Sequence, residues 1–261
     1  IYDLGINSSW LSCVEDEKSI VVVYANWDYE VGICVLDSVG NVISNEVVLK
    51  NEALSIDPTI MKYGEEYYIT ITSIQGNVNN GDDTQQNGVY TVQMYKSKDL
   101  KTWDYVSDIV KYQNNIEDID LIHDGEILSC IFEKEVIDKG MSTINVVQSK
   151  DMGKSWSTPK ELLSLVADQE PARLCFKDDK WYLYYSSDKD NIGKSYSGAK
   201  AYYAIFDKEF NKCSQDHMIK IEDDKGVLLY DVEFYDDKVE FLYAQDYLNE
   251  NSLVLESIAI E

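Results

Sequence analysis

A short pattern of apolar and polar positions recurs along the chain, with two strand-like segments flanking a turn. An acidic or polar start leads into an apolar segment, a turn carrying Gly or Asp, and a second segment rich in Tyr, Val and Ile. Apolar runs of this length, bounded by turn residues, predict β-hairpins rather than helices. The pattern is clearest in the segments that start at Ile56, Gln169 and Tyr230, and weaker in those that start at Glu117 and Ser8.

The spacing of the hairpins predicts the architecture. Equivalent positions fall near Ser9, Asp57, Asp118, Glu170 and Asp231, at intervals of 48, 61, 52 and 61 residues. A repeat of about 50 residues corresponds to one propeller blade of four short strands. We therefore expect an all-β fold, a five-bladed β-propeller of four-stranded antiparallel blades, with a β-sandwich as the rival architecture.

A third strand-like segment follows every hairpin, and a fourth follows four of them, so the last blade lacks an outer strand. We expect the N-terminal segment 1–6 to supply that strand and close the ring. The chain 1–261 is then one domain, with blades at about 8–50, 56–110, 116–164, 168–221 and 228–261 plus 1–6. Only PKELLSLVADQ (159–169) resembles a helix, of one or two turns, although its start overlaps STPKELL (157–163), which is the expected fourth strand of the third blade.

Charge narrows the choice of partners. The chain carries 23 Lys and Arg against 48 Asp and Glu, a net charge of −25, while 44% of its residues are hydrophobic, enough for a packed core. So negative a surface repels phosphate backbones and anionic membranes, although it can also serve solubility alone. We expect no nucleic acid partner and no insertion into a membrane, since no apolar run approaches the roughly 18 residues of a span.

The five cysteines are widely scattered, without a C-x-x-C pair, and His123 and His217 stand alone, which disfavours a zinc site. Most of the cysteines lie in apolar runs, so we expect buried free thiols and a reducing compartment. No signal peptide is visible at the start IYDLGINSSW, which favours a cytoplasmic location.

Two short motifs resemble the Asp-box of sialidases and related propellers. SKDMGKSW (149–156) matches its pattern with Ser155 in the Thr place, and SKDLKTW (97–103) is one residue shorter. In such turns the Asp accepts backbone N–H bonds and the Trp packs between strands, so Asp99 and Asp151 are expected to be structural. A sialidase mechanism needs three arginines to clamp a carboxylate, whereas this chain has only Arg173. For similar reasons, phosphate-using relatives are disfavoured.

The chain better resembles the five-bladed propeller glycosidases of the arabinanase, β-xylosidase and invertase type. The resemblance implies one Asp as base or nucleophile, a second Asp that positions and tunes the acid, and a Glu as general acid. EDIDLIHDGE resembles the second-Asp blade, with Asp118 or Asp120 as the candidate, and QEPARLCFKDDKWYLYYS resembles the Glu blade, with Glu170 as the acid. Neighbouring carboxylates are expected to raise the pKa of such an acid.

The base departs from the family pattern. Its equivalent place holds Ser8-Ser9-Trp10, and Asp57, which has a base-like sequence, comes one blade late. Three interpretations stay open: Asp57 is the base in a rotated arrangement, the base is missing and the protein only binds, or the geometry belongs to another family. Each acid can also simply bond backbone N–H groups beside the central channel.

Trp10, Trp27, Arg173 and Asp231 are further candidates for binding substrate, the tryptophans by stacking on a sugar ring or else by packing in the core. No cofactor is expected. DKDNIG, from Asp188, is only a partial calcium-loop pattern, because Ile192 and Ala199 occupy expected ligand places.

These residues favour a glycan-active enzyme, a glycoside hydrolase with carboxylate acid/base chemistry in a central funnel. The alternative is a non-catalytic propeller that binds carbohydrate or protein within a larger assembly, or a scaffold fused to other domains.

Overall fold

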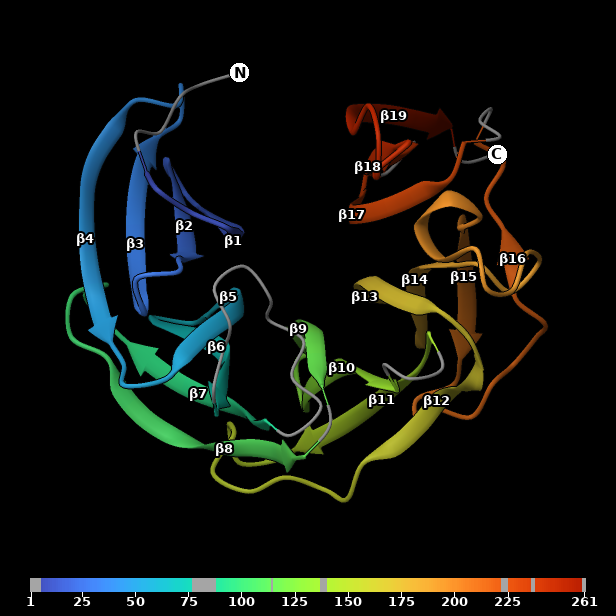
Figure 1. The fold of residues 1–261 in the computed structure, drawn as a ribbon. Helices are drawn as coiled ribbons and strands as arrows, with labels where there is room; N and C mark the ends of the chain where they lie inside the picture. The colour runs from blue at the N-terminus through green and yellow to red at the C-terminus, as the bar shows by residue number, and fades with distance from the viewer. Residues whose placement is uncertain are drawn as a thin grey trace. The chain divides into compact units, whose positions relative to one another are not determined.

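The computed structural model describes residues 6–76, 88–113, 115–136, 140–221, 225–235 and 238–259. These residues form five antiparallel sheets of consecutive strands, the blades of a five-bladed β-propeller (Figure 1). The prediction of an all-β propeller is therefore confirmed, and the alternative of a β-sandwich is rejected.

Four of the sheets have four strands and the last has three, among the residues described. The first contains β1 (Trp10–Asp16), β2 (Ser19–Ala25), β3 (Glu30–Asp37) and β4 (Val42–Lys50). The second contains β5 (Leu54–Tyr63), β6 (Glu66–Gln75), β7 (Val89–Ser97) and β8 (Asp104–Tyr112). The third contains β9 (Ile116–His123), β10 (Leu128–Val136), β11 (Met141–Ser149) and β12 (Lys160–Ala167). The fourth contains β13 (Gln169–Lys177), β14 (Lys180–Ser187), β15 (Lys200–Phe206) and β16 (His217–Met218), and the fifth β17 (Val227–Phe234), β18 (Lys238–Gln245) and β19 (Ser252–Ala259).

The chain divides into two compact units, residues 1–130 with 147–158 and residues 131–146 with 159–261. In the first unit β5 contacts both β1 and β9, and in the second β13 contacts β17. Within each unit, the first strands of successive sheets are therefore neighbours. These are the strands that carry the predicted site residues.

Each unit has its own apolar core, made by the inner strands of its sheets. β2 is a continuous apolar run that is buried along most of its length, as expected for a strand covered on both faces. The core of the first unit includes Val21, Val23, Val31, Ile33, Ile69 and Ile71. That of the second includes Tyr184, Val227, Leu229, Val232, Phe241 and Tyr243.

The hairpin turns follow the chemistry seen in the sequence. Between β13 and β14, Lys177 pairs with Lys180 and leaves Asp178 and Asp179 as a two-residue loop. Both aspartates have positive φ, 52° and 60°, which is the type I′ geometry that matches the twist of the strands. Asp tolerates this conformation better than most residues, so the KDDK sequence fixes the register of the hairpin.

The first strands of three sheets carry a β-bulge near their starts. The register shifts between Ile56 and Thr59 in β5, between Pro171 and Arg173 in β13, and between Leu229 and Asp231 in β17. A bulge leaves residues unpaired and re-aims their side chains, and it recurs beside functional sites. The bulge in β5 contains the acid–proline pair that begins at Asp57, and the bulge in β13 directly follows the pair that begins at Glu170.

Two expectations were wrong. The segment 159–169 is not helical, because residues 160–167 form β12, which pairs with β11 and buries Leu162 and Leu163. The tertiary pairing overrides a weak local helical preference. The cysteines are all free, but only Cys34 and Cys130 are buried, whereas Cys13 and Cys213 are exposed.

Other expectations fall outside the described residues. Residues 1–5, needed for closure by the N-terminal segment 1–6, are among these, as is most of the loop from Gly76 to Gly88. The single-domain blade limits remain a prediction. No helix among the described residues is long and apolar enough to cross a membrane.

Candidate functional site

The first unit brings Asp57 and Asp118 together. The backbone N–H of Asp118, in β9, donates a hydrogen bond to Oδ2 of Asp57, in β5, over 3.2 Å. Both residues have positive φ, 45° and 50°, a conformation that costs energy for a residue with a side chain. Such strain is retained where the surrounding structure enforces it, often at functional sites.

Asp120 occupies a different environment from Asp118. Its side chain is 7% exposed, and its Oδ1 accepts a hydrogen bond from the N–H of Leu121 over 2.9 Å. Burial raises the pKa of the Cys130 thiol, and the charge of Asp120 adds to the shift. Of the two candidates for the second Asp, Asp118 is the one found beside Asp57.

In the second unit Glu170 lines a small pocket that is half open to solvent and has a cavity volume of about 10 Å³. The pocket is also lined by Asp168, Asp188, Ser195 and Tyr196. None of these four residues was predicted from the sequence. The available signals were the position of Asp168 two residues before Glu170 and the unusual length of the loop from Ser187 to Gly198.

Asp188, which is buried, and Asp168, which is partly buried, line this pocket together with Glu170 and are linked by hydrogen bonds. The N–H of Asp168 donates to Oδ1 of Asp188 over 3.1 Å, and the N–H of Asp188 donates to the carbonyl of Asp168 over 3.2 Å. Burial raises the pKa of Asp168, a hydrogen bond from the Ser195 hydroxyl opposes the shift, and the charge of Asp188 adds to it. The pocket therefore contains a carboxyl group that holds its proton more tightly than an exposed aspartate.

The loop that follows β14 is organised around the Asp188 carboxylate. Oδ2 of Asp188 accepts hydrogen bonds from the N–H groups of Gly193, Lys194 and Ser195, over 2.8, 3.0 and 2.9 Å. The carboxylate thus fills a nest of backbone N–H groups made by its own loop. The Asp188 carboxylate of DKDNIG is therefore engaged by backbone donors, and no group of three or more His, Cys, Asp or Glu side chains that could hold a metal ion occurs in the described part of the chain.

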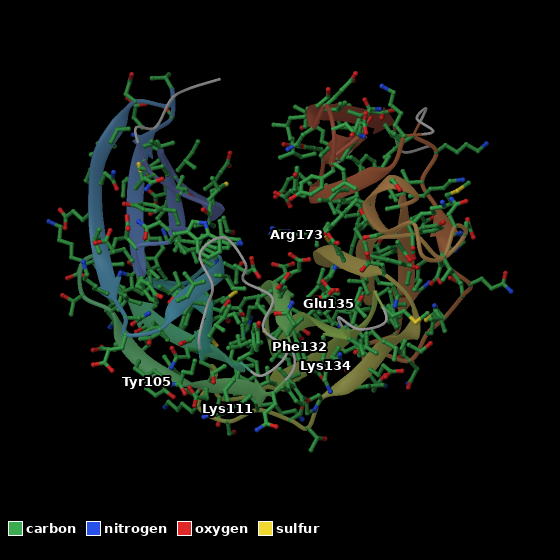
Figure 2. The ribbon with its side chains drawn as sticks, viewed as in Figure 1. Tyr105, Lys111, Phe132, Lys134, Glu135 and Arg173 are labelled. Atoms are coloured by element: carbon green, nitrogen blue, oxygen red, sulfur yellow. The ribbon has the colours of Figure 1, made fainter. Side chains whose placement is uncertain are left out.

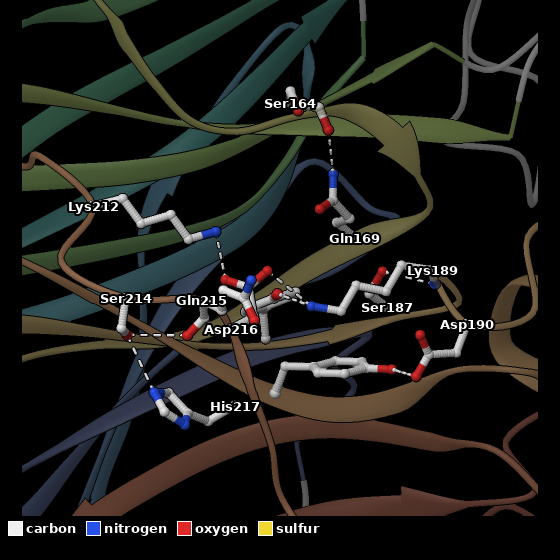
Figure 3. A network of polar contacts seen from close by, with 12 residues as sticks. Ser164, Gln169, Ser187, Lys189, Asp190, Lys212, Ser214, Gln215, Asp216 and His217 are labelled. Carbon is white, nitrogen blue, oxygen red and sulfur yellow. Dashed lines mark hydrogen bonds and ion pairs between the residues drawn. The ribbon is translucent and has the colours of Figure 1, made fainter.

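A polar network fixes the base of this loop (Figure 3). Lys189 Nζ contacts Asp216 Oδ2 over 2.9 Å, donates to the Tyr185 hydroxyl over 2.7 Å, and lies 3.8 Å from the centre of the Tyr202 ring. Burial opposes ionisation of Asp216, but hydrogen bonds from Lys212 and Lys189 hold its pKa below the ordinary value. The ion pairs and the cation–π contact anchor the loop to β14 and β15.

Arg173 lies on β13, just after the bulge (Figure 2), with acidic residues of β17 around it. Its Nε is 3.7 Å from Asp231 Oδ1, and its Nη2 is 3.6 Å from Glu233 Oε1. The structure thus joins two of the predicted binding residues, Arg173 and Asp231. The only arginine of the chain has carboxylate partners, so its charge is already compensated within the protein.

The two predicted tryptophans also lie together, in the first unit. The ring centroids of Trp10, at the start of β1, and Trp27, in the turn before β3, are 5.0 Å apart with the planes tilted by 52°. Trp10 packs against the core, whereas Trp27 is 38% exposed. The pair is therefore anchored on one side and open to solvent on the other.

The two Ser-x-Asp turns hold backbone, not substrate. Asp99 Oδ1 accepts N–H bonds from Lys101 and Thr102 over 2.9 and 2.8 Å. Asp151 accepts bonds from the N–H and hydroxyl of Ser155, and these bonds lower its pKa to about 2. These hydrogen bonds stabilise the turns between strands.

Comparison with known proteins gives the fold and not the family. No family model matches the chain, and no curated protein matches it. Solved structures do match. The family-43 endo-arabinanase of Bacillus licheniformis has 12% identity and a TM-score of 0.60, over 98% of this chain and 96% of the other. A thermostable family-43 glycoside hydrolase has 11% identity and a TM-score of 0.66, over 98% and 91%. The β-1,2-mannobiose phosphorylase of Listeria innocua has 9% identity and a TM-score of 0.65, over 98% and 90%. The chain shares its fold with glycoside hydrolases and with a phosphorylase.

Proposed function

We propose that the protein is a glycan-active enzyme, a glycoside hydrolase that works by carboxylate acid/base chemistry. Glu170 is the general acid that protonates the leaving-group oxygen, Asp118 positions the acid, and Asp57 is the base. The observation that carries the proposal is the hydrogen bond from the Asp118 N–H to the Asp57 carboxylate. It supports the interpretation in which the base lies on β5.

The first sheet lacks a carboxylate where the family pattern places the catalytic base. The corresponding place in the first sheet holds Ser8, Ser9 and Trp10, none of which can act as a carboxylate base. Asp57 supplies a carboxylate on the neighbouring strand, and its Oδ2 is held by an N–H donor of the second-Asp strand. A base must be held in one orientation to be effective, which this contact favours.

The environment of Glu170 favours its role as the acid. It shares its pocket with Asp168 and Asp188, of which Asp188 is 1% exposed. A carboxyl group that must donate a proton near neutral pH is helped by burial and by neighbouring negative charge. The fold shared with family-43 enzymes adds a carbohydrate substrate to the proposal, whereas the single ion-paired arginine argues against a phosphate co-substrate.

The leaving group provides a sharp test of the two roles. Wild-type protein, Glu170→Gln and Asp57→Asn are assayed on oligosaccharides of arabinose, xylose, galactose and mannose and on the matching 4-nitrophenyl glycosides. A sugar leaving group needs protonation and 4-nitrophenolate scarcely does, so Glu170→Gln should lose at least about 100-fold on oligosaccharides and far less on the aryl glycosides. Asp57→Asn should lose activity on both.

Glu161→Gln is the matched control, because Glu161 is exposed on β12 in the same unit and should leave turnover within about twofold. Turnover of no substrate by the wild type, or equal turnover by wild type and Glu170→Gln on oligosaccharides, would falsify the proposal. Glycan binding without turnover would instead identify a binding module.

A further inference from the structure

The pocket of Glu170 has one aromatic wall, which the roles proposed above do not use. Tyr196 lines the pocket, and its ring packs against Tyr247 in a tilted arrangement, with the centroids 4.9 Å apart and the planes inclined by 46°. Both rings are partly exposed. We propose that this pair, the Tyr196–Tyr247 platform, binds the leaving-group sugar of a neutral oligosaccharide; the assignment to the leaving-group side rests on Glu170 being the acid.

The position of the platform defines which part of a substrate it can bind. A general acid must lie within hydrogen-bond reach of the glycosidic oxygen, so the unit next to the acid is joined to that oxygen. A ring lining the same small pocket as Glu170 is therefore placed to contact the departing sugar. The flat apolar face of a tyrosine suits the C–H face of a sugar ring, while its hydroxyl can bond a sugar hydroxyl.

The platform is held rigidly by two independent attachments. Ser195, the residue before Tyr196, gives its N–H to Asp188 and its hydroxyl to Asp168. The carbonyl of Tyr196 and the backbone of the next residue lie so close to Gly226 that a Cβ there would overlap them. A recognition element that is already ordered loses less conformational entropy when a ligand binds.

Gly226 also connects the two halves of the platform. Its carbonyl accepts the N–H of Asp246, the residue before Tyr247, over 3.2 Å. One glycine thus contacts the backbone beside each aromatic ring, and its positive φ of 93° is one that a glycine adopts without strain. The spacing of the two rings is therefore set by backbone packing.

Charge indicates the class of leaving group. Asp168 and Asp188 line the pocket beside Tyr196, and the chain carries a net charge of −25. An anionic sugar such as a uronic acid or a sugar phosphate would be repelled there, because no cationic side chain lines the pocket among the described residues. The platform should therefore select neutral sugars.

The experiment measures kcat and KM on neutral oligosaccharides for wild type, Tyr196→Ala, Tyr196→Phe, Tyr247→Ala and Tyr105→Ala. Tyr105 is the matched control (Figure 2), because it is 53% exposed and packs edge-on against Tyr95 at 5.6 Å, in the other unit. We expect Tyr196→Ala to raise KM about tenfold with little change in kcat, and Tyr196→Phe to regain most of that loss. Tyr247→Ala should raise KM about threefold, and Tyr105→Ala should match the wild type.

A glycan array, probed with Glu170→Gln alone and combined with Tyr196→Ala, separates the two proposals. Turnover with the same KM in Tyr196→Ala and Tyr105→Ala would overturn the platform and leave the proposed function intact. Neutral glycans bound without turnover, and lost with Tyr196→Ala, would support the platform and overturn the enzyme. A wild type that neither binds nor turns over any neutral glycan, or that prefers uronic acids, would overturn the platform.

Discussion

Replacing Asp188 with alanine should loosen the loop that forms the wall of the Glu170 pocket. The side chain is 1% exposed, and its two oxygens accept four backbone N–H groups. Two of the four donors, Gly193 and Lys194, belong to exposed residues and can bond water instead, whereas those of Ser195 and Asp168 are partly buried.

The expected cost follows from these donors. An N–H that keeps no partner in a buried place costs about 1–3 kcal/mol, and one that reaches water costs much less, so the loss for Asp188→Ala is about 3 kcal/mol. Removing the charge also relieves its repulsion with Asp168, which offsets part of this loss. A net loss of about 2 kcal/mol lowers the melting temperature of a domain of this size by about 4–8 °C.

Thermal unfolding at pH 7, followed by circular dichroism, measures this loss, and trypsin cleavage after Lys189 or Lys194 reports opening of the loop itself. Asp190→Ala is the matched control, since its carboxylate lies in the same loop but accepts a single hydrogen bond from the described residues, from the Tyr202 hydroxyl to Oδ2 over 2.8 Å. That variant should lose about 1 kcal/mol. If Asp188→Ala melted within 1 °C of wild type and resisted trypsin equally, the nest would not stabilise the loop.

Three further predictions concern pH and backbone geometry. Because burial raises the pKa of Asp168, the folded state binds a proton more tightly than the unfolded state. The stability of the wild type relative to Asp168→Asn should therefore fall as pH rises from below about 4 through the folded pKa. Urea titrations at pH 3.5 and 7 that showed no such fall would contradict this. A Cβ at Gly226 would overlap the neighbouring loop, so Gly226→Ala should lower the free energy of unfolding by about 3 kcal/mol. Gly193→Ala is the control, because Gly193 has positive φ but open space around it, and it should lose about 1 kcal/mol. Equal melting temperatures for the two variants would refute the close approach at Gly226. The hydrogen bond from Lys62 is the main cause of the lowered pKa of Asp16. Asp16→Asn should therefore lower the free energy of unfolding above pH 4, by at most about 1 kcal/mol for a pair that solvent reaches, and this loss should vanish as pH falls through the folded pKa. A loss independent of pH would exclude the ion pair as its source.

The fold could be predicted from the sequence because the hairpins repeat along the chain. Each blade is a run of consecutive strands, so pattern, turn chemistry and spacing act locally and are visible without the structure. The Asp178-Asp179 turn is an example, since its residues determine its backbone type. The segment 159–169 was ambiguous for the opposite reason: its leucines fit a helix or a fourth strand equally well, and pairing with β11 decided for the strand.

The candidate site was predictable only in part. The sequence alone identified Glu170, Asp118 and Asp57 as candidates. Each of them lies at the start of a repeat, so their equivalent positions can be aligned without the structure. The choice of Asp118 over Asp120 needed the structure, because the backbone N–H of Asp118 bonds the Asp57 carboxylate, whereas Asp120 is buried and accepts a hydrogen bond from the N–H of Leu121.

The sequence by itself determined the strand pattern, the number of blades, the acidic charge and the absence of a sialidase arginine triad. Only the tertiary structure could bring Asp168 beside Asp188, place Tyr196 at the Glu170 pocket and pack it against Tyr247, 51 residues further along the chain. The physical reason is that a repeat produces a local periodic pattern of apolar and polar residues, which the sequence shows directly. A pocket instead depends on contacts between residues far apart in sequence, and no local pattern records them.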